Sequence, residues 1–187
     1  MKSTVFLSGS RNISRLNPII CDRLKKMIDK RLCLVIGDAN GADKAVQKYL
    51  ANAQYDDVVV FCAGDVCRNN VGAWRVNNVY ADPALKGRDF YEQKDKAMAS
   101  AADFGFVLWD GKSPGSINNV LELVKARKAV VVYFEPEKSF QNLKKPSDIL
   151  ALLRQCDESD YRDLNKKIHF DRRLADMKIS SQGSLGL

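Results

Sequence analysis

Three short segments of this 187-residue chain combine glycine with side chains that can hold an anion or accept a proton. Residues 8–11 read Ser-Gly-Ser-Arg, residues 37–43 read Gly-Asp-Ala-Asn-Gly-Ala-Asp, and residues 110–116 read Asp-Gly-Lys-Ser-Pro-Gly-Ser. Glycine allows tight turns, serine offers a hydroxyl group, and arginine can hold a phosphate with two hydrogen bonds. A helix that begins after such a segment adds backbone N–H groups and a favourable dipole. Taken singly, each segment is also typical of an ordinary turn from a strand to a helix.

The carboxylates of these segments are the candidate catalytic groups. Asp110 ends a predicted strand, where it could accept hydrogen bonds from ribose, act as a general base, or simply close an Asx turn. Asp43 lies in the first turn of a predicted helix, a position that the helix dipole alone favours. The one histidine, His169, lies in a polar C-terminal stretch, which argues against a His-based triad or a multi-histidine metal site. Chemistry would have to rely on carboxylates, arginine, lysine, serine or backbone groups, and we expect no metal and no cofactor.

The elements that must position these groups follow from the hydrophobic pattern. Short apolar runs alternate with longer amphipathic runs through the first ~135 residues, which is the pattern of a βα repeat. We therefore expect an α/β, Rossmann-like, doubly wound fold with a mostly parallel five-stranded sheet. The strands are expected at residues 4–8, 33–36, 58–62, 104–109 and 129–134, and the helices at residues 18–30, 42–51, 90–101 and 117–126.

The three segments all follow predicted strands, so they should share one edge of the sheet. Ligands of open parallel sheets bind beyond the carboxyl ends of the strands, where the strand order reverses. No Gly-x-Gly-x-x-Gly fingerprint and no Walker A sequence is present, which disfavours ordinary NAD dehydrogenases and P-loop ATPases. The predicted ligand-binding residues are Gly9, Ser10, Arg11, Gly37, Asp38, Gly41, Gly111, Ser113, Gly115, Ser116, Asn118 and Trp74.

A long irregular stretch at residues 63–86 interrupts the βα pattern, and a loop of this length is usually functional or disordered. Its Trp74 argues against disorder and could stack on a base, although aromatic residues more often belong to the core. After residue 136 the composition becomes polar, with helices expected near residues 147–154 and from about residue 160. We predict a nucleotide-binding domain at residues 1–136 and a helical C-terminal extension with a flexible tail at residues 137–187.

The three segments together resemble the SLOG superfamily, the Rossmann-like domains named for the DNA-processing SMF/DprA proteins and the Lonely Guy phosphoribohydrolases. The resemblance covers residues 1–134. It is strongest for a branch with Gly-Ser-Arg and Gly-Gly-Ala-x-Gly-Ala-Asp motifs, and this chain has Asp38 in place of the second glycine of the latter motif. It implies binding of nucleotides, nucleoside phosphates or ADP-ribose-like ligands. It also implies that the first and fourth strands are neighbours and that their exit loops form the cleft.

The chain departs from the Lonely Guy pattern at the positions that carry catalysis. Those enzymes use a Pro-Gly-Gly-x-Gly-Thr-x-Glu-Glu loop and an upstream arginine. Here Asn118 and Asn119 stand where the glutamates should be, and Lys94 stands about where the arginine should be. An amide cannot accept a proton as a carboxylate does, so we expect phosphoribohydrolase activity to be absent or very slow.

Charge and cysteine content bound the remaining classes. The net charge is +7, and six of these charges come from residues 1–50, which hold ten basic and four acidic residues. Much of this excess lies on one predicted helix, as expected for a solvated face. The five cysteines are odd in number and lack CxxC spacing, so we expect reduced thiols. Because no apolar run approaches the ~20 residues that span a bilayer, we expect a soluble, cytoplasmic protein without a membrane partner.

Three functions are compatible with these observations. The favoured interpretation is a domain that senses or carries a nucleotide, nucleoside phosphate or ADP-ribose-like ligand, which would be its small-molecule partner. The alternative is an N-glycosidase or other hydrolase acting on nucleotides, with Asp110, Asp43 or Asp38 as the working carboxylate. A DNA-binding module, which the basic first third suggests, ranks last, because the basic residues lie mainly on one predicted helix and are not interleaved with aromatic ones. Formation of a homo-oligomer is left open.

Overall fold

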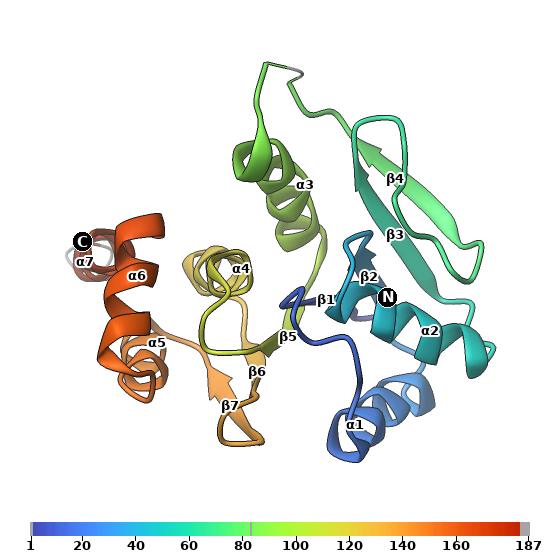
Figure 1. Ribbon diagram of the computed structural model, residues 1–187, viewed down its shortest axis with the longest axis horizontal. Coiled ribbons are helices and arrows are strands. Elements are labelled where there is room, and N and C mark those ends of the chain that lie inside the picture. Colours follow the sequence, from blue (N-terminus) through green and yellow to red (C-terminus); the bar gives the residue numbers. More distant parts are fainter. Residues whose placement is uncertain (1, 83, 184–187) are drawn as a thin grey trace.

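The computed structural model describes residues 2–82 and 84–183 and places them around one sheet (Figure 1). Within that part of the chain the sheet has seven strands in the order β4-β3-β2-β1-β5-β6-β7. Neighbouring strands are parallel except β6 and β7, which are antiparallel. The strands are β1 (Thr4–Gly9), β2 (Cys33–Gly37), β3 (Val58–Ala63), β4 (Arg75–Val79), β5 (Phe104–Trp109), β6 (Val130–Phe134) and β7 (Ser139–Leu143).

The prediction of a mostly parallel α/β sheet is confirmed, but the expected number of five strands is wrong. The two additional strands are the edges of the sheet, β4 and β7. Strand β4 reads Arg-Val-Asn-Asn-Val and is largely exposed, and β7 reads Ser-Phe-Gln-Asn-Leu. An edge strand is covered on fewer sides than a central one, so it needs no continuous apolar run. The hydrophobic pattern therefore gave no signal for either strand.

Helices cover both faces of the sheet and bury an apolar stripe against it. Figure 1 shows α1 and α2 on one face, and α3 and α4 on the other. Strand residues alternate accordingly: Leu34 and Ile36 face the α1 and α2 side, whereas Val35 faces the α3 and α4 side. The helices are α1 (Pro18–Asp29), α2 (Ala42–Asn52), α3 (Gly87–Ala101), α4 (Pro114–Lys125), α5 (Pro146–Leu153), α6 (Glu158–Ile168) and α7 (Phe170–Gly183).

The strand order reverses between β1 and β5. The chain builds β1 to β4 outward in one direction, and α3 then returns it to β5, which pairs with β1 from Val5↔Phe104 to Gly9↔Leu108. The first and fourth predicted strands are therefore neighbours. Their carboxyl ends meet at the switch point, which is where a doubly wound sheet leaves room for a ligand.

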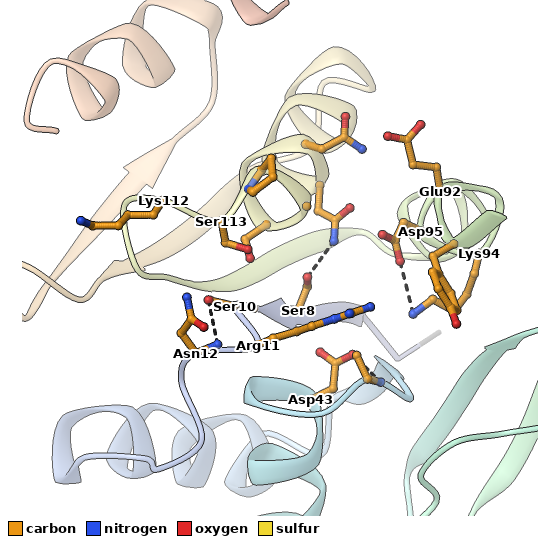
Figure 2. A pocket seen from close by; sticks show the side chains of 18 of the residues that line it. Ser8, Ser10, Arg11, Asn12, Asp43, Glu92, Lys94, Asp95, Lys112 and Ser113 are labelled. Atoms are coloured by element: carbon orange, nitrogen blue, oxygen red, sulfur yellow. Dashed lines mark hydrogen bonds and ion pairs between the residues drawn. The ribbon is translucent and has the colours of Figure 1, made fainter. Parts of the chain in front are cut away.

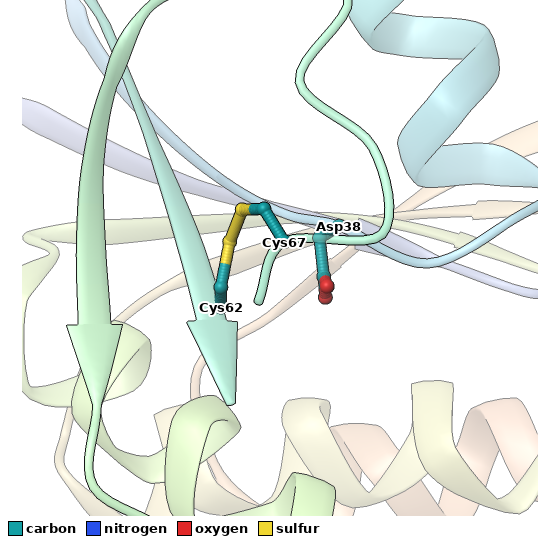
Figure 3. Close-up of side chains that lie close together, drawn as sticks. All are labelled: Asp38, Cys62 and Cys67. Atoms are coloured by element: carbon teal, nitrogen blue, oxygen red, sulfur yellow. A yellow bond between two sulfur atoms is a disulfide. The ribbon is translucent and has the colours of Figure 1, made fainter. Parts of the chain in front are cut away.

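The loop after β3 folds back onto the end of that strand. A disulfide joins Cys62, near the end of β3, to Cys67, and their Cα atoms are 5.2 Å apart (Figure 3). The expectation that all five cysteines are reduced is wrong for this pair, because a turn in the loop brings together two residues whose spacing matches no familiar motif. Trp74, at the end of the same loop, is 8% exposed and donates its indole N–H to the Tyr55 carbonyl oxygen.

The C-terminal helices pack against α4. Leu152 of α5, Leu164 of α6 and Phe170 of α7 belong to the same apolar cluster as Ile117 of α4. Helix α7 extends to Gly183, and residues 184–187, where the predicted flexible tail ends, lie outside the described residues. None of the described helices combines the length and apolar character needed to cross a membrane.

Candidate functional site

A cavity of about 520 Å³ opens at the switch point, beyond the carboxyl ends of β1 and β5. The loop after β1 and the start of α2 line one side of it, and α3 and the N-terminus of α4 line the other (Figure 2). In Figure 2 the side chain of Arg11 extends across this space, above Asp43 and toward Lys94 and Asp95. The cavity lies where a parallel sheet of this order is expected to bind its ligand.

The exit loops of β1 and β5 are tied together by one carboxylate. Asp110 Oδ2 accepts hydrogen bonds from Ser10 Oγ and Asn12 Nδ2, both at 2.7 Å. Its Oδ1 accepts from the backbone N–H groups of Ser113 and Lys112 at 2.8 and 3.2 Å. Burial alone would raise the pKa of Asp110, but these hydrogen bonds outweigh it and lower the pKa below its usual value. Asp110 thus holds the two loops in register, and it does not line the cavity.

The N-terminus of α4 presents two buried polar atoms without a partner among the described residues. The Ser116 hydroxyl and the Asn119 Oδ1 atom make no hydrogen bond, although the two residues are only 2% and 4% exposed. The Asn119 amide instead donates through Nδ2 to Ser8 Oγ at 2.7 Å. A buried polar group without a partner costs about 1–3 kcal/mol, so such groups usually mark a place where a ligand or water completes the bonding. Both residues line the cavity.

A cluster of buried and half-buried charges adjoins the cavity, and three of its members, Asp43, Lys94 and Asp95, line it. Asp38, which is 1% exposed, accepts three hydrogen bonds from Arg68, and these outweigh burial to hold the Asp38 pKa below its usual range. Lys94 lies 3.6 Å from Asp38 and 3.3 Å from Asp95. Burial would lower the pKa of Lys94, but the surrounding carboxylates raise it. Burial raises the pKa of Asp95, and it raises that of Asp43 to about 6 despite the nearby Lys94.

Two arginines from distant segments converge on one aromatic ring. The Arg68 guanidinium lies 4.2 Å from the centre of the Tyr91 ring, and the Arg11 guanidinium lies 5.9 Å from it. Arg11 comes from the loop after β1, Arg68 from the loop after β3, and Tyr91 from α3. All three line the cavity. Basic and aromatic side chains that are separated in the sequence are therefore interleaved in space.

The structure brings most, but not all, of the predicted site residues to this cavity. Trp74 is buried in the apolar core on the α1 and α2 side of the sheet, and Gly41 serves the turn into α2 with a φ of +83°. Asp38 lies below the cavity and Asp110 behind it. The predicted residues that line the cavity are Gly9, Ser10, Arg11, Asp43, Ser113, Gly115, Ser116 and Asn118, whereas Gly37, Asp38, Gly41, Gly111, Asp110 and Trp74 do not.

Sequence reasoning missed the contribution of α3. Tyr91, Glu92 and Asp95 all line the cavity, yet they lie within an ordinary amphipathic helix and not at a strand exit. The buried Lys94 was noted only for its alignment with a catalytic arginine. The pattern that could have indicated these residues is the high density of charged side chains on a helix that leads to the switch-point strand β5.

A second group of potential ligand atoms lies beside Arg68. The side-chain ligand atoms of Asp38, Cys62 and Cys67 all lie within 4.8 Å of one another (Figure 3). The two sulfur atoms are bonded to each other, and both carboxylate oxygens of Asp38 accept hydrogen bonds from Arg68. In this state the group offers no open position to a metal ion, and we assign none to it.

The sheet order and the cavity define a Rossmann-like α/β domain with a polar site at its switch point. Solved structures of similar fold include DNA processing protein A from Helicobacter pylori, which is described as having a unique single-stranded DNA binding mode. The likeness has a TM-score of 0.54 at 15% sequence identity and covers 70% of this chain. It spans 64% of the length of that protein. No protein-family model and no curated protein matches the chain.

This comparison corrects the expected partner. A free nucleotide or ADP-ribose-like molecule was favoured from the sequence and DNA was ranked last, whereas the protein of similar fold is one that binds single-stranded DNA. The ranking rested on the basic residues of one predicted helix, which have no aromatic residues between them. The fold interleaves Arg11, Tyr91 and Arg68 across three segments instead.

Proposed function

We propose that this chain is a SLOG-type domain that binds single-stranded DNA in the cavity at its switch point. The observation that carries the proposal is the meeting of Arg11, Arg68 and Tyr91 at one concave site. Single-strand binders combine cationic groups, which hold the backbone, with aromatic faces, on which bases stack. The likeness to a protein that binds single-stranded DNA supports the same reading.

The phosphate end of the site is formed by Arg11 and the start of α4. Arg11 is exposed and makes no ion pair within the described part of the chain, so its charge is available to a ligand. The N-terminus of α4 adds backbone N–H groups and the positive end of the helix dipole. The buried Ser116 hydroxyl can donate to the same anion, which would satisfy an otherwise unpartnered group.

The base end of the site is formed by Tyr91 and Asn119. The Tyr91 ring is half-buried beside the Arg68 guanidinium, which gives a flat, polar-edged surface for a nucleobase. The Asn119 Oδ1 atom is an acceptor without a partner among the described residues, and it can take an N–H group of a base. A duplex keeps its bases paired and stacked, so a site of this kind favours a single strand.

Replacement of Arg11 tests the proposal. Arg11→Ala should weaken the binding of a fluorescein-labelled oligodeoxythymidine by about 1.5–3 kcal/mol, the range for a hydrogen bond to a charged group, when binding is followed by fluorescence anisotropy. Arg15→Ala is the matched control, because Arg15 is exposed on the same loop but does not line the cavity. Equal affinities for Arg11→Ala and Arg15→Ala, with both variants folded, would refute the assignment of this cavity.

A further inference from the structure

A second cavity, of about 450 Å³, lies near the amino ends of the parallel strands, whereas the first lies at their carboxyl ends. Helix α4 runs from the carboxyl end of β5 to just before the amino end of β6. The last residue of β7, Leu143, pairs with the first residue of β6, Val130, at the same end of the sheet. The C-terminal end of α4, the junction of β7 with α5, and α7 together form the cavity. Its floor is apolar, with Leu121 and Val124 both nearly fully buried.

The rim of this second cavity is strongly basic. Lys125, Arg127, Lys144 and Lys145 are exposed, and none of the four makes an ion pair with the residues that the structure describes. A fifth cation, Arg173, lines the cavity and pairs with Glu122 at 2.6 Å. Asp176 is the acidic residue among those lining the cavity.

The two adjacent lysines on the rim are held in place by the start of α5. Asp148 Oδ2 accepts hydrogen bonds from the backbone N–H groups of Lys144 and Lys145 at 2.9 and 3.1 Å. The backbone of the pair is therefore fixed, and neither ammonium group makes an ion pair within the described part of the chain. A fixed pair of cations beside a concave surface gives a polyanion a defined place to bind.

The first cavity cannot hold a long polyanion with its own cations. Lys94 and Arg68 are paired with buried carboxylates, and Lys112 pairs with Asp160 at 3.1 Å. Arg11 is thus the cation lining the first cavity that has no ion pair among the described residues. A strand that extends beyond one or two phosphates needs unpaired cations elsewhere, and these gather around the second cavity.

We propose that the second cavity is a further contact for the backbone phosphates of the same single-stranded DNA. This inference rests on the proposed function of the first cavity. The two cavities adjoin along α4, but their exposed cations lie at its opposite ends, Arg11 beside the N-terminus and Lys125 in the last turn. The 12 residues of α4 span roughly 18 Å, so a dinucleotide should reach the cations at one end but not those at both. The second contact should therefore matter for long strands and not for short ones.

The test compares two ligands and two double variants. Lys144→Ala/Lys145→Ala removes the fixed pair. Lys26→Ala/Lys30→Ala removes two exposed lysines, one in the last turn of α1 and one just after it, on the other face of the sheet. Each variant is titrated by anisotropy with a labelled thymidine dinucleotide and with an oligodeoxythymidine of about 20 nucleotides, which is longer than the ~4–16 nucleotides that one single-strand-binding fold covers. Titrations are repeated over a salt series, and thermal melting checks that both variants are folded.

The Lys144/Lys145 variant should lose affinity for the long oligonucleotide alone. We expect a roughly five- to thirtyfold loss from two exposed charge contacts, and a salt slope smaller by about 0.7 for each phosphate contact removed. Dinucleotide binding should be unchanged, and the Lys26/Lys30 control should match the wild type with both ligands.

Three outcomes would overturn the inference. In the first, the Lys144/Lys145 variant binds the long oligonucleotide with the same affinity and salt slope as the wild type. In the second, the variant binds both ligands more weakly by the same factor. In the third, oligoglutamate binds the wild type more tightly than DNA does and binds the variant more weakly, which would assign the cavity to an acidic protein partner. If Arg11→Ala still weakens binding in any of these cases, the proposed function stands without the second contact. If the wild type binds neither oligonucleotide, the proposed function itself has failed.

Discussion

Asp43 sets how much negative charge lies under the proposed DNA site. It is 7% exposed, lines the cavity, and has a pKa raised to about 6 by burial. Below that pH the carboxyl group is protonated and neutral, and above it the carboxylate adds one negative charge near the bound phosphate. Burial also raises the pKa of the neighbouring Asp95, so any titration of Asp95 acts in the same direction. Affinity for an anionic ligand should therefore fall as the pH rises through about 6.

The variant Asp43→Asn separates this effect from other titrations. At pH 7 it should bind single-stranded DNA more tightly than the wild type by roughly 1 kcal/mol, the scale of two close unit charges that are screened as in water. Its affinity should also change less between about pH 5 and pH 7, as anisotropy titrations at each pH would measure. Asp56→Asn is the control, because Asp56 is exposed and outside the cavity. An Asp43→Asn profile as steep as that of the control would contradict the role given to Asp43.

At the scale of elements, the start of α2 is locked against the loop after β1. The Ala42 backbone N–H donates to the Ser10 carbonyl oxygen at 3.0 Å. Gly41 has a φ of +83°, and a Cβ atom at this position would overlap the backbone of Arg11. Gly41→Ala should lower the free energy of unfolding by about 1–3 kcal/mol from backbone strain alone, with the overlap adding to the loss, as urea denaturation would measure.

Gly115→Ala provides the matched comparison for this prediction. A Cβ atom at Gly115 would meet no atom within 4 Å, so its stability should stay within about 0.5 kcal/mol of the wild type. If both glycine variants were equally stable, the contact between α2 and the β1 exit would not be a structural constraint.

The elements show which parts of the fold could be predicted from the sequence. The five buried or half-buried strands of the βα repeat have apolar runs, so their positions could be predicted. The loops that follow β1 and β5, beginning near Gly9 and Asp110, could be predicted for the same reason. The edge strands β4 and β7 lack such runs and were missed. The part of the cavity wall that α3 forms was missed for a related reason. Tyr91 and Asp95 lie inside α3, where helical periodicity explains their residue types without reference to a ligand.

At the scale of the whole molecule, the paired and the unpaired cations lie in different places. The carboxylates nearest the switch point neutralise Lys94 and Arg68, and they leave Arg11 available there. Around the second cavity, four cations make no ion pair with any described residue. The net charge of +7 thus says little about function until the fold shows which charges are unpaired. This arrangement favours a long polyanion over a single phosphate.

A calorimetric titration with three ligands tests this central claim most directly. The ligands are an oligodeoxythymidine of about 20 nucleotides, the same sequence as a duplex with its complement, and thymidine monophosphate. The single strand should bind at least about tenfold more tightly than either of the others, because it alone offers repeated phosphates together with accessible bases. Binding of the monophosphate as tight as that of the single strand, or no binding of the single strand, would contradict the account.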